Sequence, residues 1–564
     1  MVLGACLLPA ASGAADPAAL VVDVASVVQE SDGDDLATVQ SMFQGANTPQ
    51  DGQIAPMAQI IADLKIKRMR ILLADVYCDL DTDGSLITAH PNEWDILTQQ
   101  LDWVLQYGMY PHVAVASTMP ESFVPYGPAE TWPSAIVHRY RSYADKLIRY
   151  IVQYSFDRGG PSVVFEISNE LDIADDAPLD FPSAPRLLPL GPWARFLWWI
   201  DPATYDISGV PGLPTSYPFG GDPRRVPRGI APMQKIWADA IATLKADSEF
   251  MSNYPGRTIK VAGPAFSGFT FRWADQVPTL EERFLDYMFD PQTAAGQFNA
   301  QLDDVSFHYY PHNYYGPDAE PRDFRNGPLG PTTSLKFTTD RLQAKLAALG
   351  RPDVKLFLSE WGPTTDVDHD VNYSHKGAAL AAAFVTEAVA ARITMGSYLV
   401  MHDAVGFNPG QPGHASLMHK IIVSGNAVYL PKPAANVFRM FAMMTGTRRA
   451  VSGLPATGSN LGAFAASDAN SAGVVVFNYD VAFTDHPETF SVELTNLPFS
   501  GPVTVERYLV DAQTSNLQAY LEASEPRPDP TLQRVEQFSA DVVAGRLVLP
   551  SRTLGLGVTF WHVR

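Results

Sequence analysis

Two glutamates, each at the end of a short apolar run, are the residues of this chain whose type and spacing could carry out chemistry. Residues Phe165–Glu170 read Phe-Glu-Ile-Ser-Asn-Glu, and residues Leu356–Trp361 read Leu-Phe-Leu-Ser-Glu-Trp. Each pattern predicts a strand that delivers a carboxylate at its C-terminal end, where a (β/α)8 barrel builds its active site. A pair of carboxylates placed in this way is the minimum equipment for cleaving a glycosidic bond with retention of configuration.

The two glutamates suit different roles in that reaction, because one group must protonate the leaving oxygen while the other attacks the sugar carbon. We assign the acid/base role to Glu170, since Asn169 beside it can hydrogen-bond a sugar hydroxyl. We assign the nucleophile to Glu360, whose charge requires hydrogen-bond donors nearby. Glu166 lies deeper in its strand and is expected to be a paired interior charge. The donors and substrate contacts expected around the pair are Arg70, His308, Tyr310 and Trp361.

The elements that must position these residues alternate between strand-like and helix-like patterns, which is typical of βα units. Eight strands with intervening helices close into a barrel, so we predict an α/β fold with a (β/α)8 TIM barrel over residues 37–446. The strand runs are Met42–Gly45, Arg68–Leu73, His112–Ala116, Val163–Ile167, Ile259–Ala262, Val305–Tyr309, Lys355–Leu358 and Gly396–Met401. The helical stretches include Trp94–Tyr107, Ile136–Tyr154, Pro232–Asp247, Leu280–Phe289, Ser334–Leu349 and Gly377–Ala391.

The alternation is interrupted between residues 173 and 229, a stretch rich in Pro and Gly. It follows the strand that bears Glu170, so it is expected to emerge on the catalytic face. Trp198 and Trp199 within it are candidates for a surface on which a sugar ring stacks. The alternative is that these aromatic side chains only attach the insertion to the rim of the barrel.

After Thr447 the pattern changes to short alternating runs separated by turn residues. Such runs predict antiparallel strands, so we assign residues 447–564 to an accessory antiparallel β-sandwich. The early run Ala19–Val28, within residues 18–36, could add a strand to it. The later runs are Gly473–Phe477, Phe490–Leu494, Val503–Tyr508, Arg546–Leu549 and Gly557–Trp561.

The net charge of −21 limits the partners that this chain can bind. Nucleic acids need clustered Lys and Arg, and anionic membrane surfaces attract the same residues, so neither is expected. A neutral oligosaccharide or polysaccharide can be bound without clustered Lys and Arg. No run reaches the about 18 apolar residues of a membrane span.

Residues 1–17 resemble a secretory signal, because an apolar run from Val2 to Ala11 is followed by small residues, although the basic start is missing. We therefore expect a secreted or periplasmic protein. The segment Leu3–Cys6 also fits a lipoprotein-processing site, which is the less favoured alternative. With only Cys6 and Cys78, the chain has neither a disulfide framework nor a cysteine-based metal site.

These residues require neither a metal nor a cofactor. His308–His312 reads His-Tyr-Tyr-Pro-His without a spaced carboxylate, so hydrogen-bonding roles are expected instead of metal ligation. The sequence contains no Gly-rich phosphate loop, His-Glu-x-x-His helix or Gly-x-Ser-x-Gly elbow. Nucleotide-dependent, zinc-protease and ordinary esterase chemistry are therefore not expected.

Taken together, the order and spacing of these segments resemble family 39 of the glycoside hydrolases over nearly the whole chain. That family uses one Glu after the fourth barrel strand and one after the seventh, which implies the same roles for Glu170 and Glu360. The resemblance implies a β-D-xyloside as the first substrate, with other pentosides or a uronoside such as an iduronide next. The segments that carry it are Gly108–Val113, Met119-Pro120, Phe165–Glu170, Val261–Ala265, His308–Pro311, Ser359–Trp361, Pro431–Phe438 and Tyr508–Asp511.

Several positions depart from the family pattern and leave substrate specificity open. Ser168 and Leu171 stand where a Trp and a Pro are usual, and Ile71 follows Arg70 where a His is expected. The third strand lacks the expected Glu. Tyr398 stands near the position where the ring of a Trp usually forms the base of the sugar-binding site.

We therefore predict a retaining exo-glycosidase of the β-xylosidase type, with endo-action on an exopolysaccharide as an alternative. A carbohydrate-binding protein on a non-catalytic barrel is the alternative of another class, and the pairing of an acid with a nucleophile disfavours it. The sequence does not indicate an oligomeric state.

Overall fold

The computed structural model describes residues 17–28, 45–47, 57–72, 79–80, 86–87, 91–115, 134–169, 225–266, 280–289, 301–312, 323–325, 334–364, 369–398, 400–402, 413, 415–455 and 459–564. Glu170, Trp198 and Trp199 lie outside the described residues, as does most of the 173–229 insertion.

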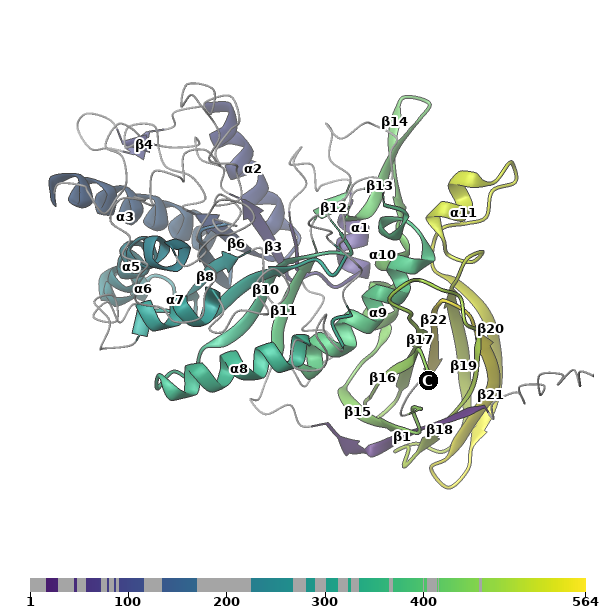
Figure 1. Cartoon of the computed structure of the whole chain (residues 1–564). Coiled ribbons are helices and arrows are strands. Elements are labelled where there is room, and N and C mark those ends of the chain that lie inside the picture. Colours follow the sequence, from purple (N-terminus) through teal and green to yellow (C-terminus); the bar gives the residue numbers. More distant parts are fainter. Residues whose placement is uncertain are drawn as a thin grey trace, which may run out of the picture.

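Eight strands pair in parallel around a closed barrel, in the order β10, β11, β2, β3, β6, β7, β8 and β9 (Figure 1). This pairing confirms the predicted mixed α/β class, and the described helices alternate with the barrel strands along the chain. The strands are β2 Gly45–Asn47, β3 Arg68–Leu72, β6 Tyr110–Val115, β7 Ser162–Ile167, β8 Thr258–Phe266, β9 Asp304–Tyr309, β10 Lys355–Trp361 and β11 Ile393–Tyr398. The helices are α1 Ala58–Asp63, α2 Pro91–Gln106, α3 Ser134–Asp157, α5 Arg225–Ala246, α6 Ser248–Ser252, α7 Leu280–Phe289, α8 Leu335–Ala348, α9 His375–Ala390 and α10 Pro433–Met443.

The barrel strands read as nearly continuous apolar runs because both of their faces are covered. On β7, Phe165 and Ile167 belong to the core shared with the helices, whereas Val164 packs inside the barrel against Ala262 and Phe357. Glu166 therefore faces the interior, since successive side chains of a strand point to opposite sides. The same alternation on β3 directs Arg68 and Arg70 inward.

One expected barrel strand is divided in two. The run Gly396–Met401 contributes to β11 in the barrel and to a separate strand, β12 Val400–His402. β12 leaves the barrel because it pairs with β13 Ser416–Val423, which forms a hairpin with β14 Asn426–Pro431. Figure 1 shows this hairpin projecting from the molecule, and no strands were predicted for these residues.

The C-terminal part forms one nine-stranded sheet, in the order β20, β19, β22, β17, β16, β15, β1, β18 and β21. The predicted β-sandwich differs from this arrangement, because the hydrogen bonding runs through a single sheet. The sheet curls until β20 and β21 approach each other across the turn that joins them. The strands are β1 Ala18–Val27, β15 Thr447–Ser452, β16 Leu461–Ser467, β17 Ala472–Asn478, β18 Glu488–Thr495, β19 Gly501–Val510, β20 Gln533–Val542, β21 Leu547–Leu554 and β22 Gly557–Val563.

The N-terminal strand β1 belongs to this sheet, where it pairs antiparallel with β15 and parallel with β18. Its residues Leu20 and Val22 are buried in the core enclosed by the curl, together with Val492 and Trp561. The segment before the barrel is thus fixed to the segment after it.

The barrel and the sheet share one hydrophobic core. Val474 and Val476 of β17 face the interior of the curled sheet, whereas Val475 and Phe477 belong to the core of the barrel. Between the two parts lies α9, whose many Ala side chains allow close approach on both sides (Figure 1). This interface is apolar and continuous, so the two parts hold each other in place.

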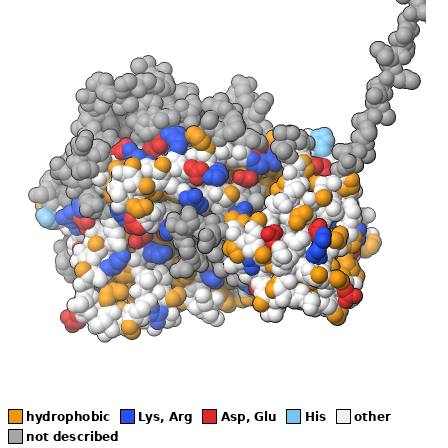
Figure 2. Space-filling model, turned by 90° about the horizontal axis from the view of Figure 1, so that it is seen from below, with side chains coloured by type: hydrophobic (Ala, Val, Ile, Leu, Met, Phe, Trp, Pro, Cys, Tyr) orange, Lys and Arg blue, Asp and Glu red, His pale blue; other side chains and the backbone are white. Residues whose placement is uncertain are grey.

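Charged side chains of both signs lie on the described surface. On the face shown in Figure 2, basic and acidic side chains are interspersed among the described residues. Among the described residues, some oppositely charged side chains pair along one helix, such as Lys235 with Asp239 and Lys336 with Asp340. None of the helices in the described part of the chain is long and apolar enough to cross a membrane.

Candidate active site

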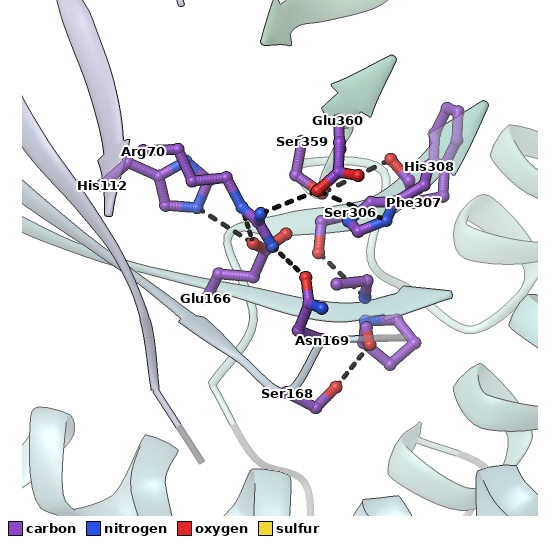
Figure 3. A network of polar contacts seen from close by, with 12 residues as sticks. Arg70, His112, Glu166, Ser168, Asn169, Ser306, Phe307, His308, Ser359 and Glu360 are labelled. Atoms are coloured by element: carbon purple, nitrogen blue, oxygen red, sulfur yellow. Dashed lines mark hydrogen bonds and ion pairs between the residues drawn. The ribbon is translucent and has the colours of Figure 1, made fainter. Parts of the chain in front are cut away.

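Arg70 joins three strand ends of the barrel through one guanidinium (Figure 3). Its Nε donates a hydrogen bond to Glu166 Oε2 at 2.6 Å, and its Nη2 donates to Asn169 Oδ1 at 2.6 Å. The remaining terminal nitrogen, Nη1, donates to Glu360 Oε2 at 3.2 Å. Only 1% of Arg70 is exposed, so the planar donor fork acts in a water-poor interior, where charge-assisted hydrogen bonds are strong.

Glu360 is held by donors on both of its carboxylate oxygens. Tyr310 donates its hydroxyl to Oε1, while Arg70 Nη1 and, at 3.9 Å, His308 Nδ1 approach Oε2. These contacts stabilise a negative charge and fix the plane of the carboxylate. The side chain of Glu360 keeps 12% of its surface exposed, so the group is oriented but still reachable from outside.

A register shift in β10 explains how Glu360 reaches this position. The pairing of β10 with β9 is regular up to Leu358 and then shifts before Glu360. Ser359 is fully buried, and its hydroxyl donates to the carbonyl of Phe307. Such irregularities re-aim side chains next to active sites.

Trp361 does not lie on a sugar-binding surface, contrary to the expectation from the sequence. Its ring packs against Phe384, Tyr398 and Phe438, with centroid distances of 4.6, 5.1 and 5.9 Å. Only 2% of the residue is exposed. The strand turns Trp361 into the core beneath α9 and α10, because Glu360 before it occupies the inward position.

Asn169 reaches Arg70 because β7 ends in a sharp turn. Ser168 adopts a left-handed backbone with φ of 85°, a conformation that is uncommon for residues other than glycine. The Ser168 hydroxyl supports this turn by donating to the carbonyl of Pro264 on β8. Glu170, the expected acid/base, is the next residue after Asn169 and lies outside the described residues.

A buried pair, Glu166 and His112, lies behind Arg70. His112 Nε2 on β6 is 3.4 Å from Glu166 Oε2, and both side chains are completely buried. Burial lowers the pKa of His112 to about 4, so the imidazole is neutral at pH 7. Burial also opposes the charge of Glu166, but the Arg70 cation outweighs it and holds the pKa of Glu166 well below its usual value.

The structure therefore gathers five of the predicted site residues, Arg70, Asn169, His308, Tyr310 and Glu360, within one polar cluster. Glu166 is the paired interior charge that the sequence suggested. His112 was missed, although a polar residue at an inward position of a barrel strand was an available signal.

No group of His, Cys, Asp and Glu among the described residues is arranged to hold a metal ion. His312, at the end of the His-Tyr-Tyr-Pro-His segment, instead packs on the ring of Phe483 at 4.6 Å. Its Nε2 lies 3.4 Å from the hydroxyl of Tyr479. This histidine therefore joins the segment after β9 to the segment that follows β17 of the nine-stranded sheet.

Comparisons with known proteins find a similarity in fold. No family model matches the chain, and no curated protein matches it in sequence. The fold is similar to the GH39 enzyme from Xanthomonas axonopodis pv. citri, with a TM-score of 0.65, 15% identity and 99% of each chain covered. A monomeric β-xylosidase from Caulobacter crescentus gives a TM-score of 0.61 at 15% identity, covering 97% of this chain and 99% of that one.

A bacterial orthologue of human α-L-iduronidase is also similar, with a TM-score of 0.62 and 13% identity over 96% of this chain and 83% of its own. These proteins are glycoside hydrolases, and GH39 denotes family 39 of that class. The likeness spans both the barrel and the C-terminal sheet, so the whole chain has the fold of GH39-like enzymes.

Proposed function

We propose that this protein is a retaining glycoside hydrolase that acts from the C-terminal face of a (β/α)8 barrel. The observation that carries the proposal is the contact of Glu360 with Arg70 and Tyr310 beside Asn169. A carboxylate that is oriented, charged and still reachable suits a nucleophile. The fold shared with glycoside hydrolases supports the same reading.

In the first step, Glu360 attacks the anomeric carbon while Glu170 gives a proton to the leaving oxygen. A glycosyl ester on Glu360 forms, and its negative charge disappears. The affinity of Glu170 for a proton then falls, so Glu170 can accept a proton from the water that attacks the ester. Arg70 and Tyr310 steady Glu360 in both steps, and Asn169 is available to a sugar hydroxyl.

A retaining mechanism requires the two carboxyl groups to be about 5 to 5.5 Å apart. A crystal structure of the enzyme with a trapped fluorosugar should show this separation, with the sugar bonded to Glu360. A separation of about 8 Å or more would leave room for a water and would indicate inversion instead.

The decisive experiment compares Glu170→Ala and Glu360→Ala on activated and natural leaving groups. Glu360→Ala should lose turnover on every substrate, because the attacking group is gone. Glu170→Ala should lose about 10²- to 10⁴-fold on oligosaccharides but retain the first step on a dinitrophenyl glycoside. The covalent intermediate should then accumulate, and added azide should restore turnover with a glycosyl azide of retained configuration.

Equal losses on both substrate types for Glu170→Ala, without a burst or an azide product, would contradict the acid/base assignment. Binding of oligosaccharides without any hydrolysis by the wild type would favour the alternative of a carbohydrate-binding barrel.

We further propose β-D-xylosides as the first substrates to test, with other pentosides and uronosides next, in a secreted or periplasmic setting. The xylosidase and iduronidase folds among the neighbours support this order. A panel of nitrophenyl glycosides identifies the sugar, and the products of oligosaccharide cleavage distinguish exo-action from endo-action.

The 173–229 insertion is proposed to form a wall of the substrate site, because it follows Glu170 directly in the chain. Replacing Trp198 or Trp199 with Ala should raise KM for oligosaccharides by about 5- to 10-fold, as expected for a lost stacking contact of about 1 to 1.4 kcal/mol. The melting temperature should change little. Unchanged KM in both variants would show that these side chains lie away from the sugar.

A further inference from the structure

Glu166 is a charged residue that the cleavage reaction does not use. It is fully buried on β7, and Glu360, not Glu166, bears the exposed carboxylate of the cluster. Keeping a carboxylate in such a place is costly unless it is paired. Its partners are Arg70 Nε at 2.6 Å and His112 Nε2 at 3.4 Å, so its position is tied to that of the guanidinium.

The geometry of Arg70 shows what this pairing does. A guanidinium is planar, so fixing one of its edges fixes the directions of the remaining N–H groups. Glu166 accepts the hydrogen bond from Nε, while Nη1 donates to Glu360 and Nη2 donates to Asn169. Without the acceptor on Nε, the side chain could rotate and release both of these contacts.

We propose that Glu166, supported by His112, is a positioning residue that orients Arg70 and shares its charge, and thereby sets the reactivity of Glu360. This inference rests on the proposed glycosidase function. Two carboxylates compete for one cation, so Arg70 stabilises Glu360 without fully neutralising it. An over-stabilised carboxylate would be a poorer nucleophile.

The proposal predicts a change in the pH profile, because Arg70 donates to both Glu166 and Glu360. The titratable and charged groups around Glu360 in the described part of the chain include Arg70 from β3, His308 from β9 and Tyr310 just after β9, with Glu166 behind Arg70 and Glu170 expected opposite. His112 and His308 also act on Glu166. When the negative charge of Glu166 is removed, the positive charge of Arg70 acts on Glu360 alone. The pKa of the Glu360 carboxyl should therefore fall.

Two substitutions separate orientation from charge. Glu166→Gln keeps an oxygen that can accept from Arg70 Nε but removes the negative charge, whereas Glu166→Ala removes both. Glu166→Gln should move the acid limb of kcat/KM to lower pH by roughly one unit, whereas Glu166→Ala should not, because Arg70 is no longer held against Glu360. Glu166→Ala should instead lower kcat about 10²-fold through misplacement of Arg70, with a smaller change in KM, and Glu166→Gln should recover much of this loss.

The matched control is Glu506→Gln. Glu506 is also a buried carboxylate, 1% exposed and paired with Arg534 and Arg564, but it lies in the nine-stranded sheet. This variant should lower the melting temperature without moving the pH profile. Rates are divided by the concentration of active sites, which is measured by titration with a fluorosugar. Unfolded protein therefore does not lower the measured rate constants.

An unchanged acid limb in Glu166→Gln, or losses in Glu166→Ala that titration attributes entirely to missing sites, would overturn the proposal. A crystal structure of Glu166→Ala in which Arg70 still contacts Asn169 and Glu360 would do the same. By contrast, a wild type that neither turns over nor is labelled by any glycoside would refute the proposed function itself.

Discussion

At the scale of single residues, the site depends on one arginine with three separate acceptors. Arg70 donates to Glu166, Glu360 and Asn169, which come from two other parts of the sequence. A guanidinium offers five donors in a fixed fork, whereas an ammonium is a point charge on a flexible stem. The choice of Arg at this position is therefore a matter of geometry as well as charge.

Replacing Arg70 with Lys should reduce kcat/KM about 10²- to 10³-fold, the range for losing a well-placed donor. The positive charge remains, but the single nitrogen of a lysine cannot reproduce contacts that Arg70 makes through three separate nitrogens. Arg68→Lys is the control, because Arg68 lies on the same strand and stacks on Phe357 at 4.0 Å instead of contacting the site. Similar losses of kcat/KM in both variants would contradict this account.

Tyr310→Phe should lower kcat by about 10-fold or more, because a hydrogen bond to a charged group contributes about 1.5 to 3 kcal/mol. The hydroxyl is the donor to Glu360 Oε1, and removing it leaves the ring in place. Pre-steady-state measurement of glycosyl-enzyme formation checks the step affected. A loss confined to KM would show that Tyr310 binds the substrate and does not orient the nucleophile.

At the scale of elements, the ends of the barrel strands carry the function while neighbouring elements fix them. β10 changes register before Glu360, β7 turns at Ser168, and His312, three residues after β9, packs on Phe483 in the segment that follows β17. His312 is fully buried, and burial, with the charge of His369, lowers its pKa to about 3. This places a protonatable group inside the contact between the two parts of the molecule.

Because the folded pKa of His312 is below its unfolded value of about 6.5, its contribution to stability is complete above that pH and is lost as the pH falls toward 3. At pH 5 the loss is about 2 kcal/mol of unfolding free energy relative to pH 7.5. Denaturant unfolding at both pH values should show it, and His312→Gln should remove this part of the pH dependence. His138→Gln, at an exposed position of α3, is the control and should leave it unchanged.

At the scale of the whole molecule, the barrel and the nine-stranded sheet form one cooperative body. Val475 of β17 and Phe560 of β22 share a hydrophobic core with α9 and α10. The N-terminal strand β1 lies between β15 and β18 in the nine-stranded sheet, so the two ends of the chain are held together. An interface that is apolar and continuous with both cores favours joint unfolding.

Val475→Asp should therefore destabilise the barrel as well as the sheet, because it buries an unpaired charge between them. The midpoint of thermal inactivation and the midpoint by circular dichroism should fall together, by more than about 10 °C for a loss of several kcal/mol. Val548→Asp, at a residue that is 66% exposed, should change neither. A sheet that melts while the activity persists would disprove the coupling.

The sequence by itself determined most of the barrel strands and indicated five residues of the polar cluster. Local periodicity predicted most barrel strands within a few residues, and polar residues at strand ends indicated Arg70, Asn169, His308, Tyr310 and Glu360. These features are local, because side-chain alternation and strand length can be read from neighbouring positions.

Only the tertiary structure decided which of these residues meet and which faces they occupy. Arg70 reaches Glu360 across 290 positions of the chain, and a register shift in β10 sends Trp361 into the core. The support of His112, the departure of β12 from the barrel and the curl of the C-terminal sheet also depend on pairing between distant strands. Such pairing is set by packing of the whole chain, so no local pattern could have fixed it.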